Sequence, residues 1–137
     1  MKRMILSVMI MLAVCTGCTS ILREHREAAA VPIENIRINT IPDGEYEGSY
    51  AGGMYRWREN RVRVKVDSGR IVAIDLLYSK EIKASDSVFI HMVKRVMERQ
   101  SLEIDALTGA TLTTRAHLKS VETALKSAEK KTQGVAE

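Results

Sequence analysis

Aromatic side chains are scarce in this 137-residue chain, which contains one Phe, one Trp and four Tyr. A hydrophobic core must therefore be aliphatic, built from Val, Ile, Leu, Met and Ala. The length argues for one domain, and a chain of this size buries about two thirds of its unfolded surface, enough for a modest core without disulfides. The charged fraction of 28% and the apolar fraction of 45% are ordinary for a globular protein and exclude wholesale disorder.

A strong charge of one sign is also lacking. The formal net charge is +4, and it falls to about +2 (19 Lys and Arg against 17 Asp and Glu) when Lys2 and Arg3 are set aside as part of a removed leader. That excess is too small to indicate nucleic-acid binding, and no RNA- or DNA-binding motif accompanies it. We therefore expect no nucleic-acid partner.

The apolar run near the start of the chain is too short to span a bilayer. It extends from Met4 to Val14, which is 11 residues, whereas a membrane-spanning helix needs about 20. It follows the cations Lys2 and Arg3, and this order is typical of an export signal. The pattern predicts that the protein is exported.

Cysteine is limited to Cys15 and Cys18. A small residue just before a cysteine, after such an apolar run, resembles a lipoprotein signal box, and Thr16 and Gly17 before Cys18 suit it. Cys15 departs from the box, which usually has Leu there, and it is a poorer acceptor because bulky Val14 precedes it. We expect residues 1–17 to be a lipoprotein-type signal peptide and Cys18 to be lipidated, because several acyl chains on one residue anchor a protein stably.

An ordinary cleaved signal and an uncleaved N-terminal anchor remain as alternatives. On the lipoprotein interpretation, the protein is anchored on the extracytoplasmic side of the membrane, in the periplasm or at the cell surface. Acylation of Cys18 leaves the mature chain without a free thiol, which excludes thiol redox chemistry and any cysteine metal site.

Residues 18–40 read as a tether of mixed composition, with a helical turn or a short strand at Ile36 to Ile38 as the only local structure expected. The segment would act as a spacer between the membrane and the domain. The domain is expected over residues 41–131, opening at the Asp43-Gly44 turn signal, and residues 132–137 are expected to fray.

Three segments of the domain have strand patterns. Glu45 to Tyr50 alternates, and Arg61 to Val66 places three valines on one face and three cations on the other. Asp67-Ser68-Gly69 is a hairpin turn, and Arg70 to Tyr78 continues as a more apolar strand. These segments predict an antiparallel meander with one wet face. The basic row is either a solvated strand face, the commoner case, or a surface for an acidic redox partner or anionic lipid; its members are Arg56, Arg58, Arg61, Arg63 and Lys65.

The periodicity then changes to that of helices. A first amphipathic helix, capped by Asp86 or Ser85, should run to about Gln100. A second follows residue 111 and carries cations near its C-terminus. The apolar positions that mark the two helices are Val88, Met92, Val93 and Val96, and then Leu118, Val121, Leu125 and Ala128. The predicted fold is α+β, a small antiparallel β-meander packed with two amphipathic helices.

The segment Thr108-Gly109-Ala110-Thr111 lies where a loop becomes the second helix. Free backbone N–H groups at a helix start form an anion site, which the helix dipole strengthens. Gly109 allows close approach of the backbone to a ligand, Ala110 keeps that approach open, and Thr111 offers a hydroxyl. From the residues alone, the geometry suits a phosphate, but a plain capped helix start is the more common explanation.

Several segments together resemble the FMN-binding domain family, over roughly residues 43–128. The family includes the covalently flavinylated subunits of the Na⁺-translocating NADH:quinone oxidoreductase and of the Rnf complex, and small exported electron carriers. The Asp-x-x-Thr-Gly-Ala-Thr sequence resembles the recognition motif of a flavin transferase. The matching segments are Asp43 to Ser49, Val62 to Val66, Ser68 to Ile71, Ile74, Gln100-Ser101, Ile104 to Ala106 and Thr108 to Thr111.

The resemblance implies that FMN is attached covalently, through a phosphoester, to Thr111. A Mg²⁺-dependent flavin transferase would install it by cleaving FAD. Gly109 and Ala110 would line the approach to the phosphate, and the motif also includes Asp105, whose role the sequence leaves open, and Thr108. Leu112 and Thr113 complete the predicted site, with Thr113 and Thr114 as first-turn caps or phosphate donors.

Two further features lie after the first strand. Gly52-Gly53 resembles a glycine pair that lies near the flavin in the family, although a plain bulge or turn explains it equally well. The aromatic residues Tyr50, Tyr55 and Trp57 either stack on the flavin ring or, in the case of Tyr55 and Trp57, form one packing cluster.

The remaining polar residues indicate no other chemistry. His25, His91 and His117 have no metal-site spacing, and no catalytic grouping can be read from the residue order, so no metal and no catalytic residue are predicted. The protein is therefore expected to be an extracytoplasmic electron carrier that exchanges electrons with redox partner proteins, rather than a stand-alone enzyme. The alternatives are a sensor module that binds FMN without a covalent link and a structural lipoprotein with a degenerate flavin site.

Overall fold

The computed structural model describes residues 19–133 of the chain. The predicted signal peptide and Cys18 lie outside the described residues, as do the last four residues. None of the helices within residues 19–133 has the length and apolar character needed to cross a membrane.

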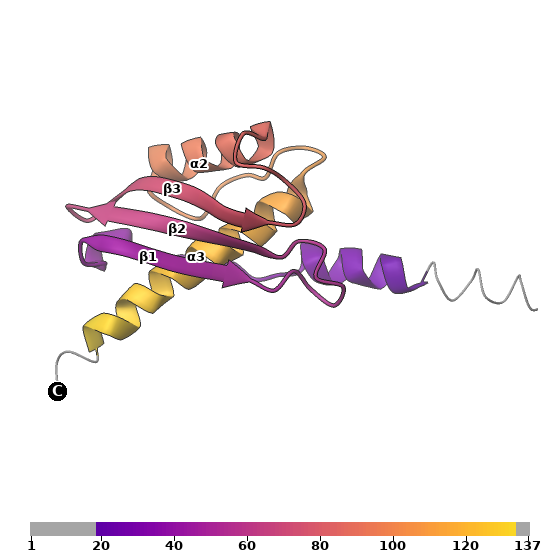
Figure 1. Cartoon of the computed structure of the whole chain (residues 1–137), viewed down its shortest axis with the longest axis horizontal. Coiled ribbons are helices and arrows are strands. Elements are labelled where there is room, and N and C mark those ends of the chain that lie inside the picture. The colour runs from indigo at the N-terminus through magenta and orange to yellow at the C-terminus, as the bar shows by residue number, and fades with distance from the viewer. Residues whose placement is uncertain (1–18, 134–137) are drawn as a thin grey trace, which may run out of the picture.

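The centre of the fold is a three-stranded antiparallel sheet in the order β1-β2-β3 (Figure 1). Its strands are β1 (Gly44–Tyr50), β2 (Asn60–Asp67) and β3 (Arg70–Ser79), as the strand patterns predicted. The predicted hairpin turn joins β2 to β3 through Ser68 and Gly69, whose φ angles are +53° and +69°. Two consecutive positive φ angles match the right-handed twist of the strands, as in the tightest hairpins.

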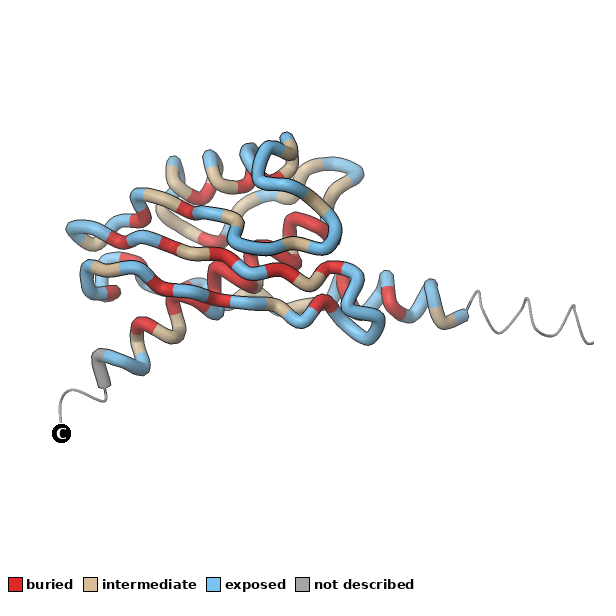
Figure 2. Tube along the Cα trace, viewed as in Figure 1, coloured by how far each residue is buried: buried red, intermediate tan, exposed pale blue. Residues whose placement is uncertain are grey.

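The alternation along β2 separates a dry face from a wet face of the sheet (Figure 2). The three valines of β2 are at most 1% exposed. On the opposite face, Arg63 donates to Glu47 at 2.8 Å and lies 3.9 Å from Glu45, both on β1. Arg56 also pairs with Glu59, and Arg58 is buried rather than part of a solvated face. Since carboxylates pair with two members of the basic row and a third is buried, the row does not form a continuous basic docking surface.

Helix α3 (Thr111–Gln133) crosses the dry face and packs closest on β1 and β2 (Figure 1). The closest approach is at Gly48 on β1, where a Cβ atom would overlap the backbone of Ser120 and Ala124. Sequence periodicity did not single out Gly48, because the constraint comes from a helix more than seventy residues further along the chain. Gly48 therefore sets how closely the helix can approach the sheet.

Replacing Gly48 with alanine should cost the domain about 3 kcal/mol of unfolding free energy, because the clash is with backbone that cannot rotate away. Urea unfolding followed by circular dichroism measures this loss. Ser49→Ala, one residue further along β1 and exposed, serves as the control and should change stability by less than about 0.5 kcal/mol. Equal stabilities for the two variants would contradict the assignment of Gly48.

Helix α2 (Ser87–Arg99) lies beside β3 and α3. Asp86 caps it by accepting from the Val88 N–H at 3.0 Å, as predicted. Its C-cap Gln100 has a left-handed backbone, and its side chain both accepts from and donates to the backbone of Ile71. The buried face of α2 is slightly rotated from the predicted one, since Phe89 is buried with Met92 and Val96, while Val88 and Val93 are only half-buried.

The segment predicted to be a tether is structured. Residues 19–29 are helical, with Glu24 and Ala28 buried on one side, and this N-terminal helix projects from one end of the sheet (Figure 1). Further on, Ile36, Ile38 and Ile41 enter the hydrophobic core, and Ile38–Thr40 forms a short 3-10 helix rather than a strand. The packed unit therefore extends beyond the boundary that was placed at residue 41.

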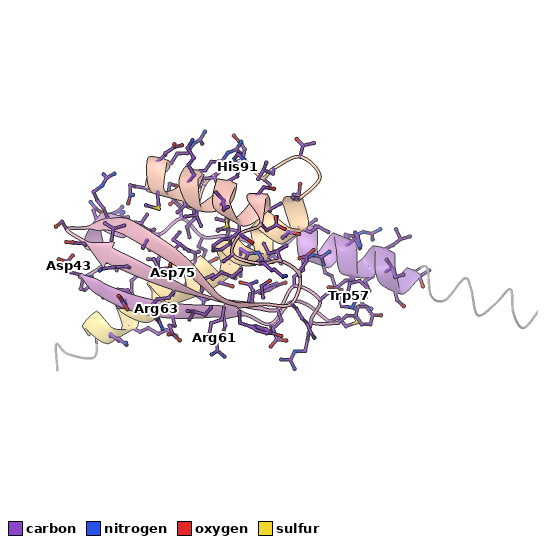
Figure 3. All side chains as sticks on the ribbon, turned by 45° about the horizontal axis from the view of Figure 1, so that its top comes forward. Asp43, Trp57, Arg61, Arg63, Asp75 and His91 are labelled. Carbon is purple, nitrogen blue, oxygen red and sulfur yellow. The ribbon has the colours of Figure 1, made fainter. Side chains whose placement is uncertain are left out.

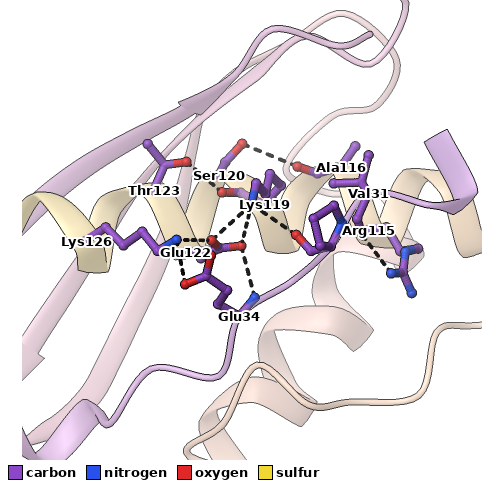
Figure 4. A network of polar contacts seen from close by, with 10 residues as sticks. Val31, Glu34, Arg115, Ala116, Lys119, Ser120, Glu122, Thr123 and Lys126 are labelled. Carbon is purple, nitrogen blue, oxygen red and sulfur yellow. Dashed lines mark hydrogen bonds and ion pairs between the residues drawn. The ribbon is translucent and has the colours of Figure 1, made fainter. Parts of the chain in front are cut away.

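Side chains of α3 bind the segment from Val31 to Glu34, which lies between the N-terminal helix and the 3-10 helix (Figure 4). Arg115 donates to the carbonyl oxygen of Val31 at 2.7 Å, and Lys119 donates to that of Pro32 at 3.0 Å. Glu122, which is 1% exposed, accepts from the Glu34 N–H and from both Lys119 and Lys126. Burial alone would raise the pKa of Glu122, but the two lysine ammonium groups outweigh it and hold that pKa below its usual range.

Candidate functional site

The predicted motif forms the entrance to α3. Gly109 has a φ of +82°, a conformation that L side chains rarely adopt. The Ala110 N–H donates to the Leu107 carbonyl at 2.9 Å and closes a turn, and the Thr114 N–H donates to the Ala110 carbonyl at 2.9 Å. Ala110 therefore occupies the capping position, and Thr111 is the first residue inside the helix.

Thr111 is exposed, and within residues 19–133 its hydroxyl takes part in no hydrogen bond. A capping threonine would accept a bond from an N–H one turn into the helix, so the capping interpretation does not describe this residue. The N–H groups of the first turn have no partners inside the helix and point in the direction from which an anion can approach. The hydroxyl and the anion-binding end of the helix thus coincide.

The backbone around Thr111 is open to a ligand. No atom lies within 4 Å of the position that a Cβ atom on Gly109 would occupy, and Thr108 is exposed beside it. Leu112 is half-buried. The motif therefore presents an uncovered strip of backbone that leads to the Thr111 hydroxyl, and these residues fit a bound phosphoryl group.

Asp105 presents its side chain to solvent, with 89% of it exposed. The carboxylate lies 3.9 Å from Arg99, a weak surface contact. The contribution of this residue to the fold comes from its backbone carbonyl, which accepts from Arg95 at 2.6 Å. The carboxylate is thus free to be recognised by another molecule.

The next two threonines face inward rather than towards the open strip. Thr113 is buried and its hydroxyl donates to a carboxylate oxygen of Glu81 at 3.0 Å. Thr114 is 1% exposed. In this arrangement Thr113 helps to hold the start of α3 against the segment after β3, and neither threonine competes with Thr111 for an incoming ligand.

A buried arginine connects this first turn to the N-terminal helix. Arg58 is 8% exposed, and its guanidinium lies 3.9 Å from the carboxylates of both Glu81 and Glu24. Glu24 is 1% exposed and, among the described residues, accepts no hydrogen bond. The chain Glu24–Arg58–Glu81–Thr113 was not predicted, because its members are spread over ninety residues and Glu24 lies in the segment taken for a tether.

The Gly52-Gly53 pair supports this arrangement. Both residues have positive φ angles, +88° and +77°. A Cβ atom at Gly52 would overlap the backbone of Glu59, and one at Gly53 would lie 2.6 Å from a carboxylate oxygen of Glu24. The pair therefore makes a tight turn that leaves space for Glu24.

The aromatic residues divide into two groups. Tyr55 and Trp57 stack on each other with ring centroids 4.9 Å apart, and both are exposed, which favours the packing-cluster interpretation. Tyr50 lies at the end of β1, where burial, and then the charge of Glu24, raise the pKa of its phenol, while Arg58 opposes the increase. The Tyr50 phenol thus responds to the charges of both Glu24 and Arg58.

His117 is buried one turn after Thr113. One ring nitrogen lies 2.8 Å from the Thr113 carbonyl oxygen, and the ring meets Phe89 edge-on. Burial lowers the pKa of His117, although the Thr113 carbonyl and the carboxylates of Glu81 and Asp86 oppose this effect. The neutral imidazole is therefore the form that the folded protein favours.

This histidine should make the domain less stable as the pH falls below about 6.5, because the unfolded chain then takes up a proton that the folded chain resists. The stability that neutral His117 contributes is complete above the unfolded pKa and is lost as the pH falls through the lower folded pKa. The loss is about 1.4 kcal/mol for each unit by which these two pKa values differ. Urea unfolding at pH 7.5 and pH 5 measures it. His117→Leu should flatten this dependence, whereas His91→Asn, at an exposed position of α2, should not. Equal slopes in all three proteins would refute the prediction.

An apolar groove lies apart from the motif. It has a volume of about 630 Å³ and runs between β3 and α2, and none of the residues 105–113 lines it. Among residues 19–133, no group of three or more His, Cys, Asp or Glu side chains is placed to bind a metal ion.

Comparison with known families gives one finding. A family model described as FMN-binding domain matches residues 56–126, just over half of the chain. The match contains β2, β3, α2, the motif and most of α3. It also contains Arg58, Glu81 and Thr113.

Proposed function

The chain belongs to the FMN-binding domain family, and from this we propose that it carries FMN covalently on Thr111 and serves as an extracytoplasmic electron carrier. One observation supports this attachment most strongly. Thr111 combines an exposed hydroxyl free of hydrogen bonds with the first turn of a helix, next to the open backbone of Gly109. A phosphodiester there is stabilised by the free N–H groups and by the helix dipole.

The attachment is a phosphoryl transfer from FAD. The Thr111 oxygen forms a bond to the phosphorus of the FMN half, the bond between the two phosphates of FAD breaks, and AMP leaves. The hydroxyl proton passes to a base that the flavin transferase supplies, together with Mg²⁺. The exposed carboxylate of Asp105 lies six residues before the acceptor and is accessible to such an enzyme, which supports a role in recognition by the transferase.

The proposed role is electron transfer between partner proteins. FMN, when bound, supplies the redox chemistry, while the protein supplies attachment and orientation. The open position of the motif supports this role, because partners can approach residues 108–111 from solvent. The export signal and Cys18 support a location on the extracytoplasmic side of a membrane, where a covalent link retains a flavin that could not readily be replaced.

Co-expression of the chain with a flavin transferase tests the attachment. We expect a band that fluoresces under ultraviolet light in a denaturing gel, and a mass increase equal to one FMN less one water. Flavin that is lost on denaturation would indicate the non-covalent alternative. A protein without any flavin would indicate a degenerate site.

A further inference from the structure

Exposed hydrophobic side chains gather at the end of the domain that carries the N-terminal helix. Five large residues there are between 39% and 65% exposed, and they come from that helix and from the loop between β1 and β2: Ile21, Leu22, Met54, Tyr55 and Trp57. We propose that this end of the domain, called here the basal face, rests on the surface of the membrane. The inference builds on the lipid anchor proposed above and adds an orientation to it.

The two segments are in contact through Glu24. Its carboxylate lies against Gly53 and 3.9 Å from the Arg58 guanidinium. Glu24 belongs to the N-terminal helix, whereas Gly53 and Arg58 belong to the loop between β1 and β2. Tyr55 stacks on Trp57, and Trp57 lies beside the same helix in Figure 3.

The composition of the basal face matches the interface of a bilayer. Tryptophan and tyrosine prefer the depth of the lipid headgroups, and Ile, Leu and Met side chains gain by entering the acyl boundary. The same two segments also carry three exposed arginines, namely Arg23, Arg26 and Arg56. Two of these arginines pair with Glu27 and Glu59, so we expect apolar contact to contribute more than attraction to anionic lipid.

The position of the proposed anchor brings this face to the membrane. Ile21 follows Cys18 by three residues, and three residues span at most about 11 Å. The N-terminal helix, which carries Ile21, is held to the domain by buried Glu24 and Ala28. The proposed lipid is therefore not separated from the domain by a flexible spacer of 22 residues. A lipid on Cys18 therefore leaves the basal face little freedom to turn away.

This orientation has a consequence for electron transfer. The start of α3 is joined to the basal end through Thr113, Glu81 and Arg58. The proposed flavin is thus carried close to the membrane surface rather than at the end of a long tether. Partners embedded in the membrane are then within its reach.

Trp57 is the only tryptophan in the chain and reports directly on this contact. The chain from residue 18 onward keeps every described residue, including the complete hydrophobic core, and Cys18 is its only cysteine. Coupling that thiol to a maleimide lipid in phosphatidylcholine vesicles supplies an anchor without acylation, and flavin-free protein avoids quenching by FMN. We expect a blue shift of Trp57 emission and at least a twofold loss of intensity when the vesicles contain lipids brominated on their acyl chains.

Matched variants test the apolar contact. The pair Ile21→Ser and Leu22→Ser should reduce the quenching by at least half, whereas Val72→Ser and Leu77→Ser, at exposed positions of β3, should leave it unchanged. Trp57 emission that stays unshifted and unquenched on the vesicles would overturn the proposal and favour a protein partner. A blue shift that depends on protein concentration without vesicles would overturn it in favour of a second copy of the chain.

Failure of this experiment is distinct from failure of the proposed function. Mass spectrometry of the native protein tests acylation of Cys18, and gel fluorescence tests the flavin on Thr111. Neither measurement depends on where Trp57 lies.

Discussion

Thr111→Ala is expected to abolish covalent flavin fluorescence completely and to leave the fold intact. The variant removes the only atom that can form the phosphoester in the proposed attachment. The hydroxyl makes no hydrogen bond within residues 19–133 and the residue is exposed, so its loss should change the unfolding free energy by less than about 0.5 kcal/mol. Gel fluorescence after co-expression with a flavin transferase, together with urea unfolding, measures both effects.

Two controls define what the loss means. Thr111→Ser keeps a hydroxyl at the same position and should retain flavin. Thr123→Ala removes an exposed hydroxyl from the same helix, one that donates to the Lys119 carbonyl, and should also retain it. Fluorescence that persists in Thr111→Ala would show that another residue is the acceptor, and fluorescence lost in Thr123→Ala would show that the assay reports on helix integrity.

Local patterns predicted the regular elements of this fold. The alternation of valine and cation over Arg61 to Val66 gave β2, and the Ser68-Gly69 turn gave the β2–β3 hairpin. Helical spacing gave α2 and α3, with Asp86 as the cap. These features depend on neighbours within a few residues, and such dependence can be read from a sequence.

Constraints between distant segments were not predicted. Gly48 is small because the backbone of α3 passes against it, and Arg58 is buried because Glu24 and Glu81 approach it from two other segments. Nothing near either residue in the sequence indicates this. A weak signal did exist in the segment predicted to be a tether, where Glu24 and Ala28 are spaced to share one helix face, but a spacing of two residues does not by itself predict a packed helix.

The start of α3 was predicted, but the directions of the side chains in its first turn were not. The change to helical spacing placed Thr111 at a helix start, and the structure puts it one residue inside the helix with Ala110 as the cap. Thr113 was considered as a phosphate donor, whereas its hydroxyl is directed to Glu81. The direction of a side chain in the first turn depends on what the helix packs against, and that partner is thirty residues away.

Arg58→Met should destabilise the domain by about 3 to 5 kcal/mol, because it leaves the carboxylate of Glu24 buried without a cation. Methionine keeps the length and the apolar contacts of the side chain, so the loss reports on the charge. Hydrogen exchange over residues 19–29 should increase as well, since Glu24 holds that helix to the domain. Urea unfolding and exchange measured by mass spectrometry test the two effects.

Neutralising Glu24, which Arg58→Met leaves buried without a cation, should restore much of the lost stability. In the double variant Glu24→Gln and Arg58→Met, the neutral amide is cheaper to bury than a carboxylate, so we expect it to be more stable than Arg58→Met alone. Arg56→Met breaks an exposed pair with Glu59 two residues away and should cost at most about 1 kcal/mol. If Arg58→Met behaves like Arg56→Met, the contacts of Arg58 with the carboxylates of Glu24 and Glu81 do not stabilise the domain. The N-terminal helix must then be held by Ala28 and the segment that follows it.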